Sequence, residues 1–423
     1  MDQDLPDTGR YKPSINIERA PRLGVPFLYI LTAYLFCATA GIMLWVYAPW
    51  VSRGAYGYPP VIMTVHFFTL GFLSMTAMGI LSQWVPVVFN VRAFGNRRGW
   101  AHFFPYLLGA LALFWSVGHG AWPVVAASGT LLALAIVWWS VDVITQLTRS
   151  TAGKDAVYWG IVGAVVGFNA VWMLGLFMAL SFLGWWPEYR ALEVHIATAL
   201  AGWMGLLVLT VQLKLNPMFS MSRAEGIRPS IPLALTGLGV ALAWASLFLG
   251  DWWLRLAAVL WTTAALVSIG QGLRTVTTGK AKAFDRVFVG VAAAWALLLL
   301  AAVLAIWLRP IAVVVAFWGF LTLIFSYQAR ILPFIVAVAV AKRLPGPVYK
   351  AFFMAQAMHP KNQPVIVGIL GVVGAALFVA GRWTMHAGLV RASALVALLL
   401  VLSELVGIAL AMSKGRAKAP VRP

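Results

Sequence analysis

The sequence has little charge and almost no cysteine. Of its 423 residues, 10% are charged and 62% are hydrophobic, whereas about a quarter of an average soluble domain is charged. This composition excludes a water-soluble globular protein and a disordered chain. The only cysteine, Cys37, lies inside an apolar run, which excludes a disulfide-stabilised scaffold. Paired cysteines, a glycine-rich phosphate-binding loop and a nucleophile–base motif are also missing, so the sequence points to a membrane protein.

What the chain has instead is a series of long apolar runs. A helix needs roughly 20 apolar residues to cross a bilayer, and twelve runs have about this length. No gap between them is long enough for a separate soluble domain. We predict an all-α, polytopic membrane protein with an N-terminal tail (1–25), a transmembrane domain (26–412) and a basic C-terminal tail (413–423). The predicted spans are 26–48, 60–86, 101–118, 122–144, 157–184, 193–216, 231–250, 253–273, 287–308, 311–337, 364–380 and 389–412.

Basic residues outnumber acidic ones, 31 to 12, which gives a formal charge of +19. In a soluble protein this excess would suggest a nucleic-acid partner. With both termini placed in the cytoplasm, 24 basic residues fall in cytoplasmic segments and 6 in outer ones, and Arg330 lies inside a span. Cytoplasmic loops of membrane proteins carry such an excess. We therefore predict a multi-pass protein of the cell (inner) membrane with cytoplasmic termini, whose charge contacts anionic lipid head groups and no nucleic acid.

Three of the predicted spans, the second, sixth and tenth, share a pattern of glycine, glutamine and proline. Their glycine-to-proline intervals are 15, 15 and 14 residues, and the spans lie four apart, which predicts a pseudo-threefold repeat of four-helix units. Part of the pattern has a purely structural origin, because glycine permits close packing and proline ends or kinks helices. A glutamine in lipid needs a partner, so all three are predicted to face the interior. The residues are Gly71, Gln83 and Pro86; Gly202, Gln212 and Pro217; and Gly319, Gln328 and Pro333.

Two histidines lie inside spans of this repeat. His66 is a turn or two below the outer end of the second span, and His195 is about one turn below that of the sixth. Neutral imidazole is the commonest metal ligand, and paired histidines on facing helices are a usual axial arrangement for haem. The pair therefore predicts a haem or metal site near the outer face. The alternative is that each histidine is a packed interior residue bonded to a carbonyl group.

The other four histidines lie nearer the ends of the spans. His119 and His386 belong to the outer layer, where each is either a further haem or metal ligand or an ordinary interfacial residue. On the cytoplasmic side, His102 is interpreted as an interface anchor and His359 as a solvated loop residue.

Ionisable and amide side chains inside the spans are few, and each needs a partner there. The sequence suggests one for most of them. We expect Glu404 to pair with Arg330, Asp142 with Lys154 or Arg149, Glu193 to lie at the outer surface with Glu188 and Arg190, and Asn169 to hold helices together.

Three segments carry a resemblance to a known family: HFFTLGFLSMTAMGILSQWVPVVF from His66, HIATALAGWMGLLVLTVQLKLNPMF from His195, and YQARILPF from Tyr327. They are similar to spans 2, 6 and 10 of divergent members of the haem-copper oxidase superfamily, subunit I. The resemblance implies that these spans line three pores and that redox centres lie toward the outer face. It also implies that His66 is an axial ligand of a low-spin haem and that His195 is a copper ligand.

Several ligands that the resemblance would require are missing. In the family, span 10 supplies two axial histidines and the outer end of span 7 supplies two copper-binding histidines, and neither span has a histidine here. The tyrosine that follows the span 6 histidine in oxygen reductases is absent too. The chain therefore looks like a non-reductase relative, such as the NnrS-type proteins linked to nitric oxide response, which are described as binding haem and copper. This implies a b-type haem, with His386 or His119 as a second axial ligand, and copper as a further metal.

Three functions stay open from the sequence. The first is haem-based electron transfer, or a nitric oxide or redox response, with a respiratory-chain or cytochrome partner and without oxygen reductase activity. The second is a secondary transporter, because repeats, interrupted spans and interior polar groups fit that class as well. The third is a haem-free structural or assembly subunit of a respiratory complex.

Overall fold

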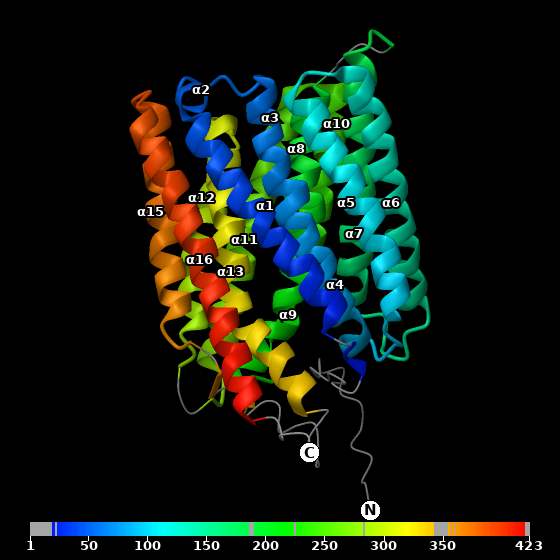
Figure 1. Cartoon of the computed structure of the whole chain (residues 1–423), viewed down its shortest axis with the longest axis vertical. Helices are drawn as coiled ribbons and strands as arrows, with labels where there is room; N and C mark the ends of the chain where they lie inside the picture. Colours follow the sequence, from blue (N-terminus) through cyan, green and yellow to red (C-terminus); the bar gives the residue numbers. More distant parts are fainter. Residues whose placement is uncertain are drawn as a thin grey trace, which may run out of the picture.

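The computed structural model of the chain describes residues 19–21, 23–185, 190–223, 226–281, 284–341, 354–355, 357–358 and 360–418, with side chains as far as 414. These residues form helices and connecting turns and include no β-strand. Twelve helical spans among them are long and apolar enough to cross a membrane. They run side by side along the length of the molecule (Figure 1). The predicted all-α, polytopic character is thereby confirmed.

Each predicted span coincides with one helix or with one continuous helical rod. Ten are single helices, and the second and sixth are each built from three consecutive segments. The last helix continues to Lys418, beyond the predicted end of the span at residue 412. The single helices are α1 (Gly24–Val46), α5 (Asn96–Gly118), α6 (Trp122–Thr148), α7 (Ala156–Ser181), α10 (Ser230–Leu249), α11 (Asp251–Thr277), α12 (Val287–Leu304), α13 (Arg309–Ala341), α15 (Gln363–Trp383) and α16 (Ala387–Lys418), with a short α2 (Ala48–Ser52) after α1.

The second and sixth spans each contain an eight-residue π-helical segment, which the sequence did not predict. Gly71 and Gly202 are each the fifth residue of their segment. The glycines of the repeat therefore occupy the same position in both π-helical segments. α13 is an uninterrupted α-helix over the matching stretch. π-Helical turns are rare in proteins, and those that occur often lie at functional sites. The second span consists of α3 (Pro59–His66), η2 (Phe67–Ser74) and α4 (Met75–Val88), and the sixth of α8 (Ala191–Ala197), η3 (Thr198–Gly205) and α9 (Leu206–Ser220).

Both π-helical segments are approached closely by a neighbouring helix at their glycine. A Cβ atom on Gly71 would lie 2.7 Å from the Cβ atom of Phe36 in α1. A Cβ atom on Gly167 in α7 would meet the backbone of Gly202. These glycines therefore allow close helix packing, as small residues do in membrane bundles.

The second, sixth and tenth spans form the interior of the bundle. Over their most apolar stretches, 56%, 56% and 72% of the residues are buried, whereas the other nine spans range from 28% to 50%. Gln83, Gln212 and Gln328 are all buried, which confirms that they face the interior. Outer helices instead turn large apolar side chains such as Leu35 and Phe248 outward. This is the surface that lipid chains would cover.

The first and last helices share one end of the bundle. α1 begins and α16 finishes there, whereas α2 and the start of α8 lie at the opposite end (Figure 1). We call these the terminal end and the distal end. His66 and His195 lie in the distal half, because α3 and α8 are the first segments of spans that start at that end.

Candidate metal centre

His66 is the last residue of α3, directly before the π-helical segment η2. Its ring is half-buried, and Nδ1 lies 2.8 Å from the carbonyl oxygen of Ile62. A carbonyl oxygen only accepts hydrogen bonds, so Nδ1 is the donor and Nε2 carries the lone pair. The described residues offer Nε2 no hydrogen-bond partner. The ring is thus oriented and keeps one nitrogen available.

His195 lies in α8, three residues before η3, and is anchored in the same manner. Its Nδ1 donates to the carbonyl oxygen of Val171 in α7, at 3.0 Å. Gly175, one turn further along α7, makes room for the ring, because a Cβ atom there would lie 3.3 Å from the ring atom Cε1. The ring is half-buried, and the described part of the chain again gives Nε2 no hydrogen-bond partner.

The two histidines lie in the distal half of the bundle, on spans that are joined by a hydrogen bond. The indole Nε1 of Trp203 in η3 donates to Ser74 Oγ in η2 at 3.1 Å. The two π-helical segments that follow the histidines thus belong to one local structure.

Aromatic donors from neighbouring helices hold the π-helical segments in place. Beyond the indole bond between the two segments, a tyrosine hydroxyl donates to a carbonyl oxygen of η2 and a second indole donates to a hydroxyl of η3. A π-helical segment that is bonded from outside at several points has a defined shape. The contacts are Tyr106 Oη to Leu70 O at 2.9 Å and Trp244 Nε1 to Thr198 Oγ1 at 3.0 Å.

The number of protein ligands narrows the kind of metal. Among the described residues, no group of three or more His, Cys, Asp or Glu side chains is placed to hold a metal ion. A zinc-type structural ion takes four protein ligands. Haem iron takes four nitrogens from the porphyrin and needs only two axial side chains. A pair of anchored histidines would therefore suffice for haem but not for a four-ligand structural ion.

His119 and His386 are exposed residues at the distal end. His119 Nδ1 donates to the carbonyl oxygen of Trp115 at 2.8 Å, and its ring stacks on the Trp115 indole. His386 Nδ1 accepts the backbone N–H of Leu389 at 3.3 Å, at the start of α16. No contact within the described residues joins either one to His66 or His195. Both have the local partners expected of interfacial residues.

His102 is buried, which corrects its interpretation as an interface anchor. Its side chain is 2% exposed, and Nε2 lies 2.8 Å from Oδ2 of Asp142. The same carboxylate pairs with Arg98. The expected partners of Asp142, Lys154 and Arg149, were therefore wrong. Those residues follow Asp142 in the sequence, whereas the observed partners come from the facing helix α5.

The expected pair of Glu404 and Arg330 is also wrong. Glu404 is 1% exposed and accepts a hydrogen bond from Gln363 Nε2 at 2.7 Å, because α16 turns it toward the start of α15. Arg330 Nε instead lies 3.2 Å from Oδ2 of Asp285, in the turn before α12. Asn169 does join helices as predicted, because its amide donates to Ser140 Oγ in α6 at 2.9 Å.

Glu193 lies in one charged group with Arg190 at the distal end, as expected, but the two are linked through other residues. The Glu193 carboxylate lies 3.3 Å from Arg309 Nη1 at the start of α13. Arg309 also pairs with Asp251, which Arg190 approaches at 4.0 Å. Two residues of the sequence interpretation, Glu188 and His359, lie outside the described residues.

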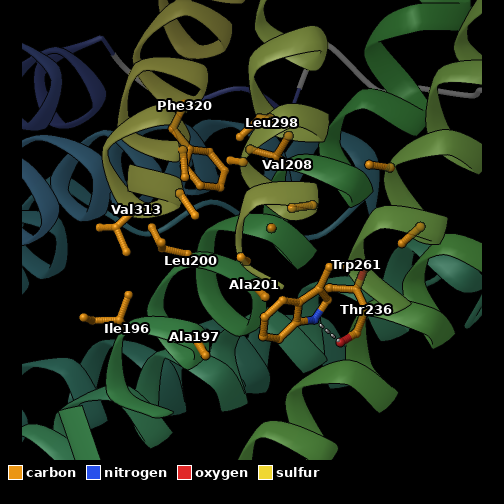
Figure 2. A pocket seen from close by; sticks show the side chains of 18 of the residues that line it. Ile196, Ala197, Leu200, Ala201, Val208, Thr236, Trp261, Leu298, Val313 and Phe320 are labelled. Carbon is orange, nitrogen blue, oxygen red and sulfur yellow. Dashed lines mark hydrogen bonds between the residues drawn. The ribbon is translucent and has the colours of Figure 1, made fainter. Parts of the chain in front are cut away.

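An apolar cavity that the sequence did not predict lies beside the sixth span. It has a volume of about 190 Å³ and is bounded by the sixth span together with α10, α11, α12 and α13 (Figure 2). Trp261 and Thr236 meet on one wall, where the indole Nε1 donates to the Thr236 carbonyl oxygen at 3.4 Å. Its sequence signal is a set of closely spaced small residues in α12, in the turn after it and in α13: Ala301, Ala302, Ala305, Ala312 and Ala316.

No family model and no curated protein matches the chain. The similarity of its motifs to haem-copper oxidase subunit I therefore stays a prediction. The function proposed next depends on the residues and contacts described above.

Proposed function

We propose that this membrane protein binds a b-type haem between His66 and His195 in the distal half of the bundle. In this proposal it is a non-reductase relative of haem-copper oxidase subunit I. Its role is respiratory electron transfer or a nitric oxide or redox response, with a respiratory-chain protein or cytochrome as its partner. The three motifs and the π-helical segments at matching register in two of the three related spans support this assignment.

The observation that carries the proposal is that two half-buried rings, on spans joined to each other, share one state; His119 has the same bond to a carbonyl oxygen but is exposed. Each ring donates from Nδ1 to a backbone carbonyl oxygen and leaves Nε2 without a partner in the described residues. Metal-bound histidines typically have this arrangement, in which the second nitrogen is fixed by a carbonyl or carboxylate.

The ligand number favours electron transfer over gas binding. When bound, haem supplies one-electron redox chemistry, and an open axial position would also admit a diatomic gas. If His66 and His195 both serve as ligands, the haem would keep no place for a gas molecule. The chain's own contribution is to orient the two rings through the carbonyl groups of Ile62 and Val171.

The test is visible and paramagnetic resonance spectroscopy of protein purified from haem-replete cells. We expect one haem per chain with a low-spin, bis-histidine spectrum in the oxidised and reduced states. His66→Ala and His195→Ala should each abolish that spectrum or convert it to high spin. The matched controls His119→Ala and His386→Ala should leave it unchanged.

Elemental analysis of the same samples separates the alternatives. Stoichiometric copper that disappears in His66→Ala and His195→Ala, without any haem band, would replace haem by copper at this pair. A protein that binds neither metal would contradict the proposal. In that case, substrate uptake by proteoliposomes would support a transporter, and stable co-purification with a respiratory complex would support a haem-free subunit.

A further inference from the structure

Glu404 is a carboxyl group in the interior of the bundle. It belongs to the last helix, α16, and is 1% exposed. Its Oε1 atom accepts a hydrogen bond from Gln363 Nε2 at 2.7 Å, and the described residues give Oε2 no hydrogen-bond partner. An ionised carboxylate inside a membrane protein is costly unless a cation pairs with it. Glu404 therefore needs a cationic partner or a bound proton.

The helices around α16 bring no positive charge to Glu404 in the described part of the chain. The main contacts of α16 are with α1, α2, α13 and α15. Tyr34 of α1 interacts electrostatically with Glu404, but a tyrosine carries no positive charge, and its hydroxyl donates to Gln328. The charged side chains of these helices lie elsewhere: Arg330 pairs with Asp285, Arg309 with Glu193 and Asp251, Arg382 and Arg391 stack on Tyr56 and Trp45, and Lys414 is exposed.

The partner of Glu404 is an amide, which can bond a carboxyl group in either protonation state. Gln363 is 6% exposed, and its Nε2 atom donates to Glu404 and to Ser403 O, the latter at 3.1 Å. Its Oε1 atom is buried without a partner in the described residues. An amide donates to a carboxylate through its nitrogen and accepts the hydroxyl of a carboxylic acid through its oxygen. A lysine or arginine at this position would instead fix the charged form.

This pair of side chains lies near the terminal end of the bundle. α15 begins there with Gln363, and Asn362, directly before it, is exposed. Gly407, one turn after Glu404 in α16, leaves space for the amide, because a Cβ atom there would lie 2.7 Å from Gln363 Oε1. The carboxyl group is thus separated from the water at the terminal end by about the first turn of α15.

We propose that Glu404 is a proton-binding site that exchanges one proton with the water at the terminal end and uses the Gln363 amide as its partner. In the resting protein the carboxyl group carries the proton. On release, the O–H bond breaks, the proton passes to water, and the carboxylate keeps the bond from Gln363 Nε2. Buried acids of this kind serve in proton relays of membrane proteins. The site shares no side chain with the histidine pair and does not depend on a bound haem.

Infrared spectroscopy of the purified full chain tests whether the proton is present and whether it exchanges. A carboxylic acid has a C=O band that a carboxylate lacks, and this band shifts when deuterium from D2O replaces the proton. We expect such a band in the wild type at neutral pH and its loss in Glu404→Gln. The matched control Glu193→Gln, which removes a carboxylate paired with Arg309, should keep it. The absence of a band that depends on Glu404, or a band that does not shift in D2O, would overturn the proposal.

A pair of variants tests whether the lack of a cation holds the proton on Glu404. Gln363→Lys places an ammonium group beside the carboxyl group, whereas Ser413→Lys adds the same charge at an exposed position of α16. We expect Gln363→Lys to lose the Glu404 band, because a paired carboxylate is stable without the proton, and Ser413→Lys to keep it. Both proteins should elute as the wild type does in gel filtration. A band of wild-type intensity in Gln363→Lys would contradict the proposal.

A comparison of salts separates a proton from a metal cation at the same carboxyl group. We expect the Glu404 band of the wild type to have equal intensity in sodium chloride and in choline chloride. A band that disappears in sodium chloride and returns in choline chloride would replace the proton by a bound sodium ion and overturn the proposal.

Discussion

Spans 2 and 6 differ from span 10 in how their polar side chains are bonded. In the first two, His66 and His195 are held by one ring nitrogen, and the other nitrogen has no partner in the described residues. In α13, Gln328 Oε1 accepts the hydroxyl of Tyr34 at 2.6 Å, and Arg330 pairs with Asp285. The glycine-to-proline spacing is nearly the same in all three spans. In the proposed assignment, one helical frame would serve ligand binding in two places and helix joining in the third.

The comparison leads to two expectations, one for each kind of side chain. A side chain with a free ligand atom contributes little to the fold, so its loss removes a ligand and costs little stability. A side chain that joins helices contributes to the fold, so its loss lowers the free energy of unfolding and leaves the ligand in place. The predictions below test this expectation, in order of decreasing effect.

The largest effect is expected at the two histidines. His66→Ala or His195→Ala should lower haem affinity by about 100-fold or more, since even residues that only orient a metal ligand cost 10- to 100-fold. The free energy of unfolding of the haem-free protein should fall by only about 0.6 kcal/mol, the average for a hydrogen bond between membrane helices. Haem titration and unfolding in mixed micelles measure the two quantities. A large stability loss with unchanged haem affinity would reverse the assignment.

Arg330→Ala should give the opposite result. Arg330 and Asp285 are mostly buried, with side chains 18% and 12% exposed. Removing one partner of a buried pair typically costs about 3 kcal/mol or more, so we expect the free energy of unfolding to fall by about 3 kcal/mol. Haem content per folded chain should stay at the wild-type value. Loss of haem in a protein of wild-type stability would contradict the distinction between span 10 and spans 2 and 6.

Gly167→Ala tests whether the shape of η3 matters to the site. The new methyl group would meet the backbone of Gly202, and overpacking of this kind costs about 2 kcal/mol. Because η3 follows His195, we also expect a weaker or altered haem spectrum. The matched control is Gly129→Ala in α6, where a Cβ atom would meet nothing within 4 Å. An altered spectrum in the control, or none in Gly167→Ala, would contradict this.

The smallest effect is expected for two tyrosine hydroxyls. Tyr34→Phe removes the bond to Gln328 in α13, and Tyr106→Phe removes the bond to Leu70 O in η2. Each should cost about 0.6 kcal/mol of unfolding free energy, the average for a hydrogen bond between membrane helices. Only Tyr106→Phe should also shift the reduction potential of the haem, because only its partner belongs to a span with a candidate axial ligand. Equal reduction potentials in both variants would show that the bond to η2 does not affect the haem site.

The sequence predicted the spans well because crossing a bilayer depends on the apolar length of a segment, which is a local property. It also placed Gln83, Gln212 and Gln328 in the interior, since an amide in lipid needs a partner. The partners themselves were often wrong. Glu404 faces Gln363 and not Arg330, because a partner depends on the rotation of each helix and on which helix lies opposite.

The π-helical segments and the cavity escaped prediction for related reasons. A π-helical turn uses the same residue types as an α-helical one, so η2 and η3 left only the shared glycine as a signal. The cavity depends on the distance between the sixth span and α13. The small residues of each helix suggest such a space only when the two helices are considered together. The four outer histidines follow the sequence more closely: His119 and His386, near the ends of spans, are exposed, and His66 and His195, inside spans, are half-buried.

One stripe of α7 decides the geometry of a site to which α7 gives no side chain. Gly167, Val171 and Gly175 follow one another at intervals of four residues and so share a face of the helix. The first admits the backbone of η3, the second offers the carbonyl oxygen that orients His195, and the third leaves space for its ring. α7 therefore fixes the position and orientation of the His195 ring. A survey of substitutions should find its least tolerant positions on this face, where no functional group would suggest them.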